Sequence, residues 1–424
     1  MATANAFTVS SLVARTITEF NDNINYIFST ANQDYVEMFQ QNMYATGGSI
    51  NIKIPGYPQV QTGLSTTASA ISDLIVPYTI TEDDLYSVVR ELSIIDAQFN
   101  ICGYDDALTE AQKDRVVDNY AYPAFLALMA RLESELYYKL KTSAWYSPID
   151  EVSKLSSINN FDAVQSVDTL MGKLRLPQMN RSMIFNYDDA ANVSASLQNM
   201  FNVGVNEKVT EEAWIGGSSD KGRLAGLDCY RSNSFTTHEA GALAGESGLT
   251  VSSVAADGKS IVIQGAPSVT SQLIDAGDKF SIAGVNWIDP VTKNVISTKL
   301  TVNAAEDSDG NGSGQVTLSL KYPLLASGEH ANVSSLPAPG AVVQVFPDRN
   351  PNFAYTKSGL SVVPLMMHDI YGADNRDARS EQKVPVKVGL QGQLTEYQNV
   401  FRISQLVGTE AFTPYLAELP SAAA

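Results

Sequence analysis

The residues whose spacing comes nearest to a binding site are Asp307, Asp309 and Asn311, followed by Gly312. Oxygen-bearing side chains at alternate positions with a glycine at the sixth are typical of the first half of a calcium-binding loop. Such a loop needs a bidentate glutamate at its twelfth position, and Leu318 stands there instead. Because the strongest ligand is missing, the pattern favours an Asp/Gly hairpin tip over a calcium site.

Other groups that could do chemistry are scattered or have an ordinary structural explanation. His238, His330 and His368 have no second ligand at zinc-site spacing, so each is expected to be a surface or turn residue. The acidic residues at 82–84 and 211–212 lie where helices are predicted to begin, which favours capping. The glycine-rich stretch that ends at Gly222 lacks the lysine spacing of a phosphate loop and predicts a solvated loop.

The chain of 424 residues contains no nucleophile elbow, no HExxH and no GxGxxG pattern. Its 28 Lys and Arg against 46 Asp and Glu give a net charge of −18. This charge argues against a protein that binds nucleic acid by neutralising its phosphates. Cys102 and Cys229 are too far apart in sequence to form a metal-ligand pair. No signal peptide or membrane-spanning segment is recognised. We therefore expect no enzyme, no catalytic residue, no cofactor and no metal.

The most unusual segment is the stretch from Ile54 to Ser72, which has no charged residue. Strands are predicted on either side of it, over 49–54 and 74–80, so the segment is interpreted as an extended hairpin. A loop of this kind buries too little apolar area to fold alone. It either moves in solvent or lies on a partner, and its Ile, Val and Tyr residues favour the partner.

Three helices are predicted in the first third of the chain. An amphipathic helix covers 9–28, and a second begins at Thr81 with an apolar face from Leu85 to Ile95. The third begins with Pro123 at its first position and runs for about 22 residues. Its apolar stripe predicts a long structural strut, formed by Phe125, Leu128, Leu132, Leu136 and Leu140.

The remaining sequence divides into three parts. Helices at 163–174 and 188–201 alternate with strands at 182–185 and 224–231, which predicts an α/β segment. Short β runs separated by turn residues then extend from about Phe235 to about Asp348 and suggest a small barrel or sandwich. Strands return at 360–366, 384–390 and 400–407. A β block between two α/β parts is interpreted as an inserted domain.

Several stretches support a family resemblance: 222–233 on entering the β block, 277–293 within it, 350–355 on leaving it, and Pro123 with 131–136 in the strut. Together with the order of elements, they resemble the major capsid proteins of tailed double-stranded DNA phages. More narrowly, the chain looks like the coat proteins of short-tailed phages of the P22 type, which carry an inserted β domain.

The resemblance implies an α+β chain with the Hong Kong 97-type capsid fold and an inserted small β-barrel. It divides the chain into five parts: an N-terminal arm at 1–45, an E-loop hairpin at 46–80, a peripheral domain with the spine helix at 81–146 and 392–424, an axial α/β domain at 147–233 and 351–391, and the inserted domain at 234–350.

The resemblance also implies the function of a major capsid protein. Such a chain self-assembles as pentamers and hexamers into an icosahedral shell that encloses double-stranded DNA without sequence-specific binding. The implied partners are copies of itself, a scaffolding protein during assembly and a portal protein at one vertex, with no membrane. The implied location is the virion capsid, assembled in the host bacterial cytoplasm.

Two sets of site residues follow from the resemblance. The E-loop is expected to contact a neighbouring subunit through Ile52, Ile54, Tyr57, Val60 and Leu64. The arm is expected to present Glu19 and Asp22 to a basic end of the scaffolding protein, although Arg15 lies among the positions where acidic residues would be expected. Since no lysine lies between Lys53 and Lys113, the loop tip cannot cross-link and the shell is expected to be held non-covalently.

Two alternatives remain open at the level of sequence. The chain could be another virion structural protein, such as a fibre or tail-tube subunit, although its long helices and α/β segment weigh against an all-β fibre. It could also be an enzyme with an unrecognised site.

Overall fold

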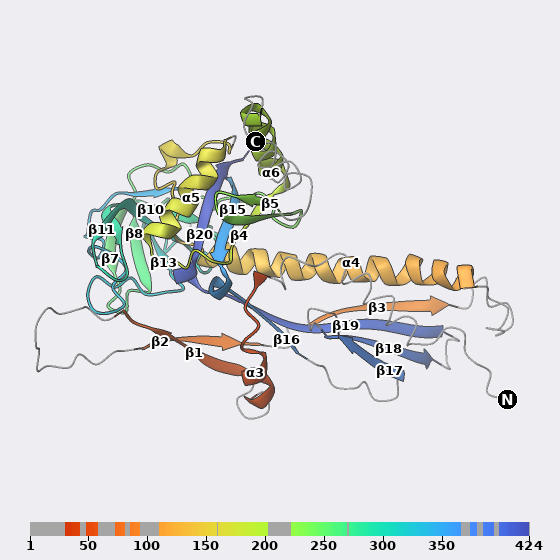
Figure 1. Ribbon diagram of the computed structural model, residues 1–424. Coiled ribbons are helices and arrows are strands. Elements are labelled where there is room, and N and C mark those ends of the chain that lie inside the picture. The colour runs from red at the N-terminus through yellow and green to blue at the C-terminus, as the bar shows by residue number, and fades with distance from the viewer. Residues whose placement is uncertain are drawn as a thin grey trace, which may run out of the picture. The chain divides into compact units, whose positions relative to one another are not determined.

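The computed structural model describes residues 30–42, 48–57, 73–80, 85–93, 110–158, 160–201, 222–268, 271–365, 374–379, 385–393 and 398–423 (Figure 1). The chain divides into two compact units. The first comprises residues 1–50, 77–135 and 361–410, and the second comprises 51–76, 136–360 and 411–424. The predicted helix at 9–28 lies outside the described residues.

The first unit contains a five-stranded sheet in the order β16-β19-β18-β17, with β3 also paired to β19. Its strands are β3 (Leu85–Ser93), β16 (Leu360–Leu365), β17 (Asp374–Arg379), β18 (Pro385–Gln393) and β19 (Gln398–Ala411). The strands expected near 360–366, 384–390 and 400–407 are confirmed. A short helix, α3 (Val36–Asn42), belongs to the same unit.

The segment after Thr81 is a strand, so the prediction of a helix there is wrong. β3 pairs antiparallel with β19 from Leu85↔Leu406 to Ser93↔Gln398. Its apolar residues fit a helical spacing, but β-branched Val88 and Val89 also suit a pleated strand. The continuous pairing with β19 makes this segment a strand rather than a helix. Local residue spacing cannot identify β19 as the pairing partner, because it lies more than 300 residues away.

The long helix α4 extends from Glu110 to Ser143 and has 34 residues, about 51 Å at 1.5 Å per residue (Figure 1). The strut is confirmed, but its predicted start at Pro123 is wrong because that residue lies inside the helix. A proline in a helix interior removes one backbone hydrogen bond, a local cost that a helix of this length tolerates. From Leu128 onward the predicted stripe is buried, with Leu132, Leu136 and Leu140 each 0% exposed.

The predicted hairpin strands are confirmed as β1 (Ser49–Pro55) and β2 (Asp73–Thr79), which pair in a two-stranded sheet. At the first-unit end of this hairpin, Tyr78 is fully buried, and its ring packs edge-on against Phe39 with 5.1 Å between centroids. The hydroxyl of Tyr78 donates a hydrogen bond to the Gly408 carbonyl at 3.0 Å. These contacts anchor the end of β2 to β19.

The second unit is built on a five-stranded sheet in the order β20-β15-β4-β6-β5. β4 and β6 are parallel and are joined through helix α6, a connection typical of an α/β segment. Helix α5 precedes β4 in the chain, and Figure 1 shows both helices beside the sheet. The elements are α5 (Phe161–Lys173), β4 (Arg181–Asn186), α6 (Tyr187–Phe201), β5 (Gly222–Leu224), β6 (Leu227–Ser232), β15 (Arg349–Thr356) and β20 (Leu416–Ala422).

The strand expected over 224–231 is two strands, β5 and β6, that form a tight hairpin. Ala225 and Gly226 make the turn with φ of 49° and 86°. Positive φ at both central positions is the hairpin-turn conformation. The sequence does not predict this turn, because alanine is not a residue that usually adopts positive φ.

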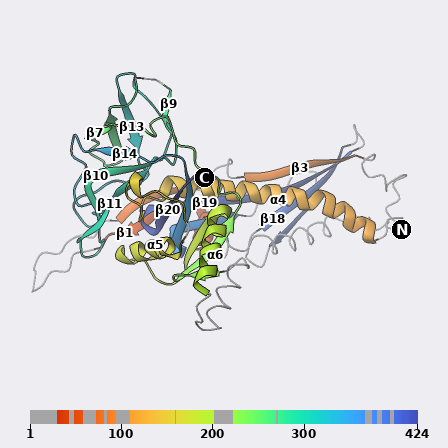
Figure 2. The same ribbon diagram turned by 90° about the horizontal axis from the view of Figure 1, so that it is seen from above.

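Between β6 and β15 the chain leaves this sheet and forms only strands (Figure 2). They make three small sheets, β11-β10-β14, β12-β9 and β13-β8-β7. The strands are β7 (Thr250–Val254), β8 (Ser260–Gln264), β9 (Gln272–Ile274), β10 (Lys279–Ile288), β11 (Val295–Asn303), β12 (Ser308–Asp309), β13 (Gln315–Ser319) and β14 (Val343–Val345). We call this segment the β block. Its all-β character confirms the sequence expectation.

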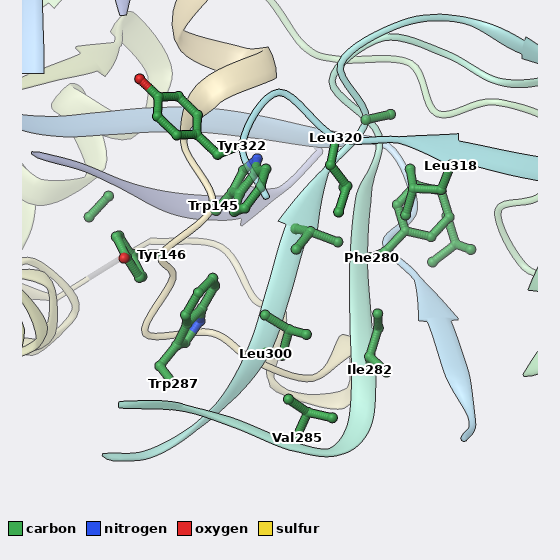
Figure 3. Close-up of a cluster of buried hydrophobic side chains, with 14 of the residues drawn as sticks. Trp145, Tyr146, Phe280, Ile282, Val285, Trp287, Leu300, Leu318, Leu320 and Tyr322 are labelled. Atoms are coloured by element: carbon green, nitrogen blue, oxygen red, sulfur yellow. The ribbon is translucent and has the colours of Figure 1, made fainter. Parts of the chain in front are cut away.

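The β block shares its core with the rest of the second unit. Trp145, which directly follows α4, stacks on Trp287 of β10 with ring centroids 6.5 Å apart. Tyr146 contacts Trp287 edge-on at 4.5 Å. Figure 3 shows these rings to the left of Phe280, Leu300 and other apolar side chains of the block. A continuous core of this kind fixes the β block to the end of α4.

Some strands fall into sheets other than those expected. The resemblance places β20 in the peripheral part, and this strand pairs with β15 along seven residue positions in the sheet that also contains β4. The resemblance places β17 and most of β18 in the axial part, and these strands pair in the sheet of β19 and β3. Strand pairing depends on contacts between distant segments, which sequence order does not specify.

Candidate functional site

The β1–β2 hairpin has one buried face and one exposed face. Ile52 is 7% exposed and Tyr78 is 0% exposed on the inner face, whereas Ile75 on the outer face is 58% exposed. Ile54 is partly buried. Thus the side chain of Ile52 is packed within its own chain, and the outer face carries the accessible apolar side chain Ile75.

The outer face also carries charge. Lys53 on β1 and Asp73 on β2 lie across from each other, with Nζ and Oδ2 3.8 Å apart. Both are well exposed, so this pair contributes little stability. Tyr57, just beyond β1, is 45% exposed. Two other predicted contact residues, Val60 and Leu64, lie outside the described residues, as do Glu19 and Asp22.

Within the second unit, the end of the hairpin strands that leads into the loop lies beside a small cavity of about 90 Å³. Ile54, Tyr57 and Leu74 of the hairpin line one part of this cavity, and Trp145, Tyr146, Tyr322 and His330 are among the residues lining the rest. Gly56 passes so close to the 329–330 segment that a Cβ there would lie 2.9 Å from Glu329 Cβ. The β block therefore supports the loop end of the hairpin strands in the same chain.

A network of four fully buried polar side chains lies where the β block meets strands β15 and β20. Lys279 of β10 donates to Glu418 Oε2 at 2.9 Å and to Asn303 Oδ1 at 3.0 Å. Asn303 Nδ2 donates to the same Glu418 Oε2 at 2.9 Å. Arg349 Nε donates to Glu418 Oε1 at 2.8 Å. All four residues are 0% exposed.

Burial and the neighbouring charges shift the pKa values in this network. Desolvation lowers the pKa of Lys279 to about 8, because burial disfavours the ammonium form, even though Glu418 acts in the opposite direction. For Glu418 desolvation alone would raise the pKa, but the charges of Arg349 and Lys279 outweigh it and lower the pKa to about 2. Glu418 is therefore a carboxylate at neutral pH.

Further polar contacts fasten the β block to the segment after α4. The Thr301 hydroxyl donates to the Trp145 carbonyl at 2.6 Å, and the Lys299 amide donates to Asp150 Oδ2 at 2.9 Å. On another side, Arg175 after α5 pairs with Asp289 at 2.8 Å. The block is thus docked by backbone and side-chain hydrogen bonds as well as by its apolar core.

The expectation that His238 is a surface or turn residue is wrong. It is 4% exposed, and its Nε2 lies 2.9 Å from Oδ1 of Asp278, which is 0% exposed. The backbone groups of His238 and Arg349 also exchange hydrogen bonds at 2.8 and 3.1 Å. His330 lines the cavity beside the hairpin, and His368 lies outside the described residues.

The calcium-like residues form a hairpin, as expected. Asp307 Oδ1 accepts from the Ala276 amide at 2.7 Å, and Asn311 Oδ1 accepts from the amides of Ser313 and Gln315. Asn311 thus holds the turn between β12 and β13, whereas Asp307 joins the start of this hairpin to Ala276. In the part of the chain that the structure describes, no group of three His, Cys, Asp or Glu residues could hold a metal ion.

Sequence inspection missed the buried network because its members are far apart in the chain. Glu418 is 139 residues from Lys279 and 69 residues from Arg349. A Lys and an Asn directly opposite each other on neighbouring strands would have been a usable signal, but it requires the β10–β11 register to be known.

The family model "P22 coat protein - gene protein 5" matches residues 100–420. Similar solved structures include "Mycobacterium phage Che8" at 12% identity, covering 93% of this chain and 90% of that chain with a TM-score of 0.44. "Capsid structure of the Cyanophage P-SCSP1u" is 11% identical over 89% of this chain and 85% of that chain, with a TM-score of 0.40. No curated protein matches the chain.

The protein is a structural protein of a phage capsid. Since the model match spans most of the sequence, the chain belongs to the P22 coat protein family. It is a major capsid protein and forms the shell of the virion. The alternative of a fibre or tail-tube subunit is thereby set aside. Among the described residues, no helix is both long and apolar enough to cross a membrane.

Proposed function

We propose that this coat protein assembles as pentamers and hexamers into a closed icosahedral shell, in which the β1–β2 hairpin of each subunit lies on a neighbour. The observation that supports this is the two-faced hairpin. Its inner face is used within the chain, and its outer face carries Ile75 at 58% exposure next to the charge-free segment at 56–72. An exposed strand pair with an accessible apolar side chain favours β-type pairing with another chain.

Ile75→Asp tests the hairpin contact. Because Ile75 is already exposed, the charge is expected to change the stability of the isolated chain by no more than about 0.5 kcal/mol. The yield of closed shells is expected to fall at least about tenfold, since a charge would be buried without a partner in each of many repeated contacts.

A matched control is Val295→Asp on β11, because Val295 is 59% exposed and also lies on a strand. Shell yield is measured by sedimentation and electron microscopy of chains coexpressed with the scaffolding protein. Equal yields for the two variants would count against the hairpin contact.

The further partners belong to the same proposal. A scaffolding protein binds the acidic arm residues Glu19 and Asp22 through a basic segment, a portal protein occupies one vertex, and the shell assembles in the host cytoplasm. The shell encloses double-stranded DNA without sequence-specific contacts. The net charge of −18 supports this last point, because a surface that does not neutralise phosphates leaves the DNA free to be packed and ejected.

Glu19→Lys combined with Asp22→Lys tests the scaffold contact. Reversing both charges is expected to lower scaffold-dependent shell yield several-fold. The difference between variant and wild type should diminish as the salt concentration is raised, because salt also weakens the attraction in the wild-type reaction. Glu37→Lys, at an exposed position of α3, is the control. An unchanged yield in the double variant would argue against docking through these residues.

A further inference from the structure

Lys279 and Asn303 are placed for reaction with each other. They are direct partners in the antiparallel register of β10 and β11. The Lys279 Nζ atom lies 3.0 Å from Asn303 Oδ1, so the Cγ atom that carries this oxygen is one bond away from the contact. This contact holds the amine beside the amide group that it would attack, and holding two reacting groups together in this way lowers the entropic cost of their reaction.

One oxygen of Glu418 touches both nitrogens that would take part. Oε2 is 2.9 Å from Lys279 Nζ and 2.9 Å from Asn303 Nδ2. A carboxylate oxygen that bridges an attacking amine and a leaving amine can take a proton from the first and give it to the second. Sequence spacing could not have suggested this arrangement, because three strands supply its three side chains.

The buried charges of the network do not balance. Lys279 and Arg349 are two cations around the single carboxylate Glu418, and all three are 0% exposed. Arg349 Nη1 is buried and has no hydrogen-bond partner among the described residues. An unbalanced buried cation is costly, so a reaction that removes one positive charge relieves that cost.

We propose that Lys279 and Asn303 form an intramolecular isopeptide bond, with Glu418 as the catalytic residue that transfers the proton. Neutral Lys279 Nζ attacks Asn303 Cγ and a C–N bond forms. Glu418 Oε2 accepts a proton from Nζ and passes it to Nδ2, the Cγ–Nδ2 bond breaks, and ammonia leaves. The reaction is an amide exchange, so it needs no oxidant, reductant or co-reactant.

The surroundings suit each step. Burial lowers the pKa of Lys279 to about 8, so a useful fraction of the neutral amine is present near neutral pH. Arg349 holds Glu418 as a carboxylate and positions it through Oε1, which leaves Oε2 facing the two nitrogens. Exclusion of water from this 0%-exposed site protects the product from hydrolysis.

The bond would fasten the start of β10 to the end of β11. It would replace an ammonium by a neutral amide and leave Glu418 and Arg349 as a balanced ion pair. Because it joins two residues of one chain, it is independent of shell assembly and produces no ladder of linked subunits.

Mass spectrometry of the purified, folded chain decides the proposal. Loss of ammonia lowers the intact mass by about 17 Da. Tryptic digestion after denaturation is expected to yield the peptides 260–293 and 300–321 joined together, with no cleavage after Lys279. Full mass and normal cleavage after Lys279, even after days of incubation of the folded chain, would overturn the proposal, whether or not the chain forms shells.

Two variants separate catalysis from the mere presence of Lys279 and Asn303. Glu418→Gln keeps a side chain of similar shape but cannot shuttle the proton, so it is expected to retain the full mass. Lys321→Met is the control: the Lys321 ammonium contacts the Ser143 hydroxyl and the Ala411 carbonyl and is no part of the proposed reaction, so the loss of about 17 Da should persist. If Glu418→Gln does not fold, the wild-type mass and the joined peptide still decide the question.

Discussion

At the residue scale, the buried network around Glu418 dominates the electrostatics of the second unit. Its carboxylate accepts hydrogen bonds from Lys279, Asn303 and Arg349, and its own amide donates to the Tyr146 carbonyl at 2.8 Å. It therefore connects β20, β10, β11 and β15 at one point. Removing one member of such a network leaves uncompensated buried charge, which is far more costly than losing a surface ion pair.

The pKa of Glu418 gives a prediction with a definite sign. Its value is lowered from 4.5 to about 2 in the folded chain, so the unfolded chain binds the proton more strongly. The stabilisation is fully present above pH 4.5 and is lost as the pH falls from about 4.5 towards 2.

Compared with a wild-type chain of full mass, in which Lys279 is still an ammonium, Glu418→Gln is expected to lower the free energy of unfolding at pH 7 by about 3–5 kcal/mol. The difference from wild type should shrink on acidification below pH 4.5, as followed by urea unfolding at a series of pH values. A difference that stays constant down to pH 2.5 would contradict the assignment. Asp289, whose pKa is also lowered to about 2, contributes equally to both chains and cancels in the comparison.

At the scale of elements, the segment between β6 and β7 passes very close to the backbone near β9. The amide of Gly241 donates to both oxygens of Asp278, at 3.2 and 3.1 Å. A Cβ at Gly241 would lie 2.5 Å from the Leu273 carbonyl oxygen and 3.0 Å from the Asp275 amide nitrogen. Only glycine fits between these backbone atoms.

Gly241→Ala is therefore expected to lower the free energy of unfolding by about 1–3 kcal/mol through overpacking. Gly172→Ala within α5 is the matched control, because nothing lies within 4 Å of an added Cβ there. That control should stabilise the chain by about 0.5–1 kcal/mol through helix propensity. Thermal unfolding of both variants is the measurement, and changes of the same sign would contradict the reasoning.

At the scale of the whole molecule, the shell depends on many copies of modest contacts. Repeated contacts between identical chains accumulate by avidity, so no single interface has to be strong. In the proposed shell the hairpin at Ile75 would contribute apolar area, and the net charge of −18 disfavours nonspecific association of free chains before assembly.

The absence of a lysine between Lys53 and Lys113 predicts a shell without covalent links between subunits. Denaturing electrophoresis of mature particles should therefore give one band at the size of the single chain. A ladder of higher bands would contradict this prediction. The intramolecular bond between Lys279 and Asn303 leaves the expected pattern unchanged.

Much of the fold was predictable because it depends on local patterns. The strands at 49–54 and 74–80, the helices near 163–174 and 188–201 and the stripe of Leu132, Leu136 and Leu140 follow from periodicity alone. The all-β character of the β block follows from its turn residues. The family resemblance joined these elements into a coat protein, and the match over residues 100–420 confirms it.

Only the tertiary structure determined the conformation where two sequence patterns compete, and the environment of residues whose partners are distant in the chain. Residues 85–93 fit a helical spacing, and the ladder with β19 makes them a strand. His238 was expected on the surface, and its partner Asp278 is buried with it. Lys279, Asn303 and Glu418 have no local motif, because their chemistry arises from three strands that meet in a water-free interior. Sequence spacing specifies short-range structure, whereas such meetings depend on pairing and burial between segments that are far apart in the chain.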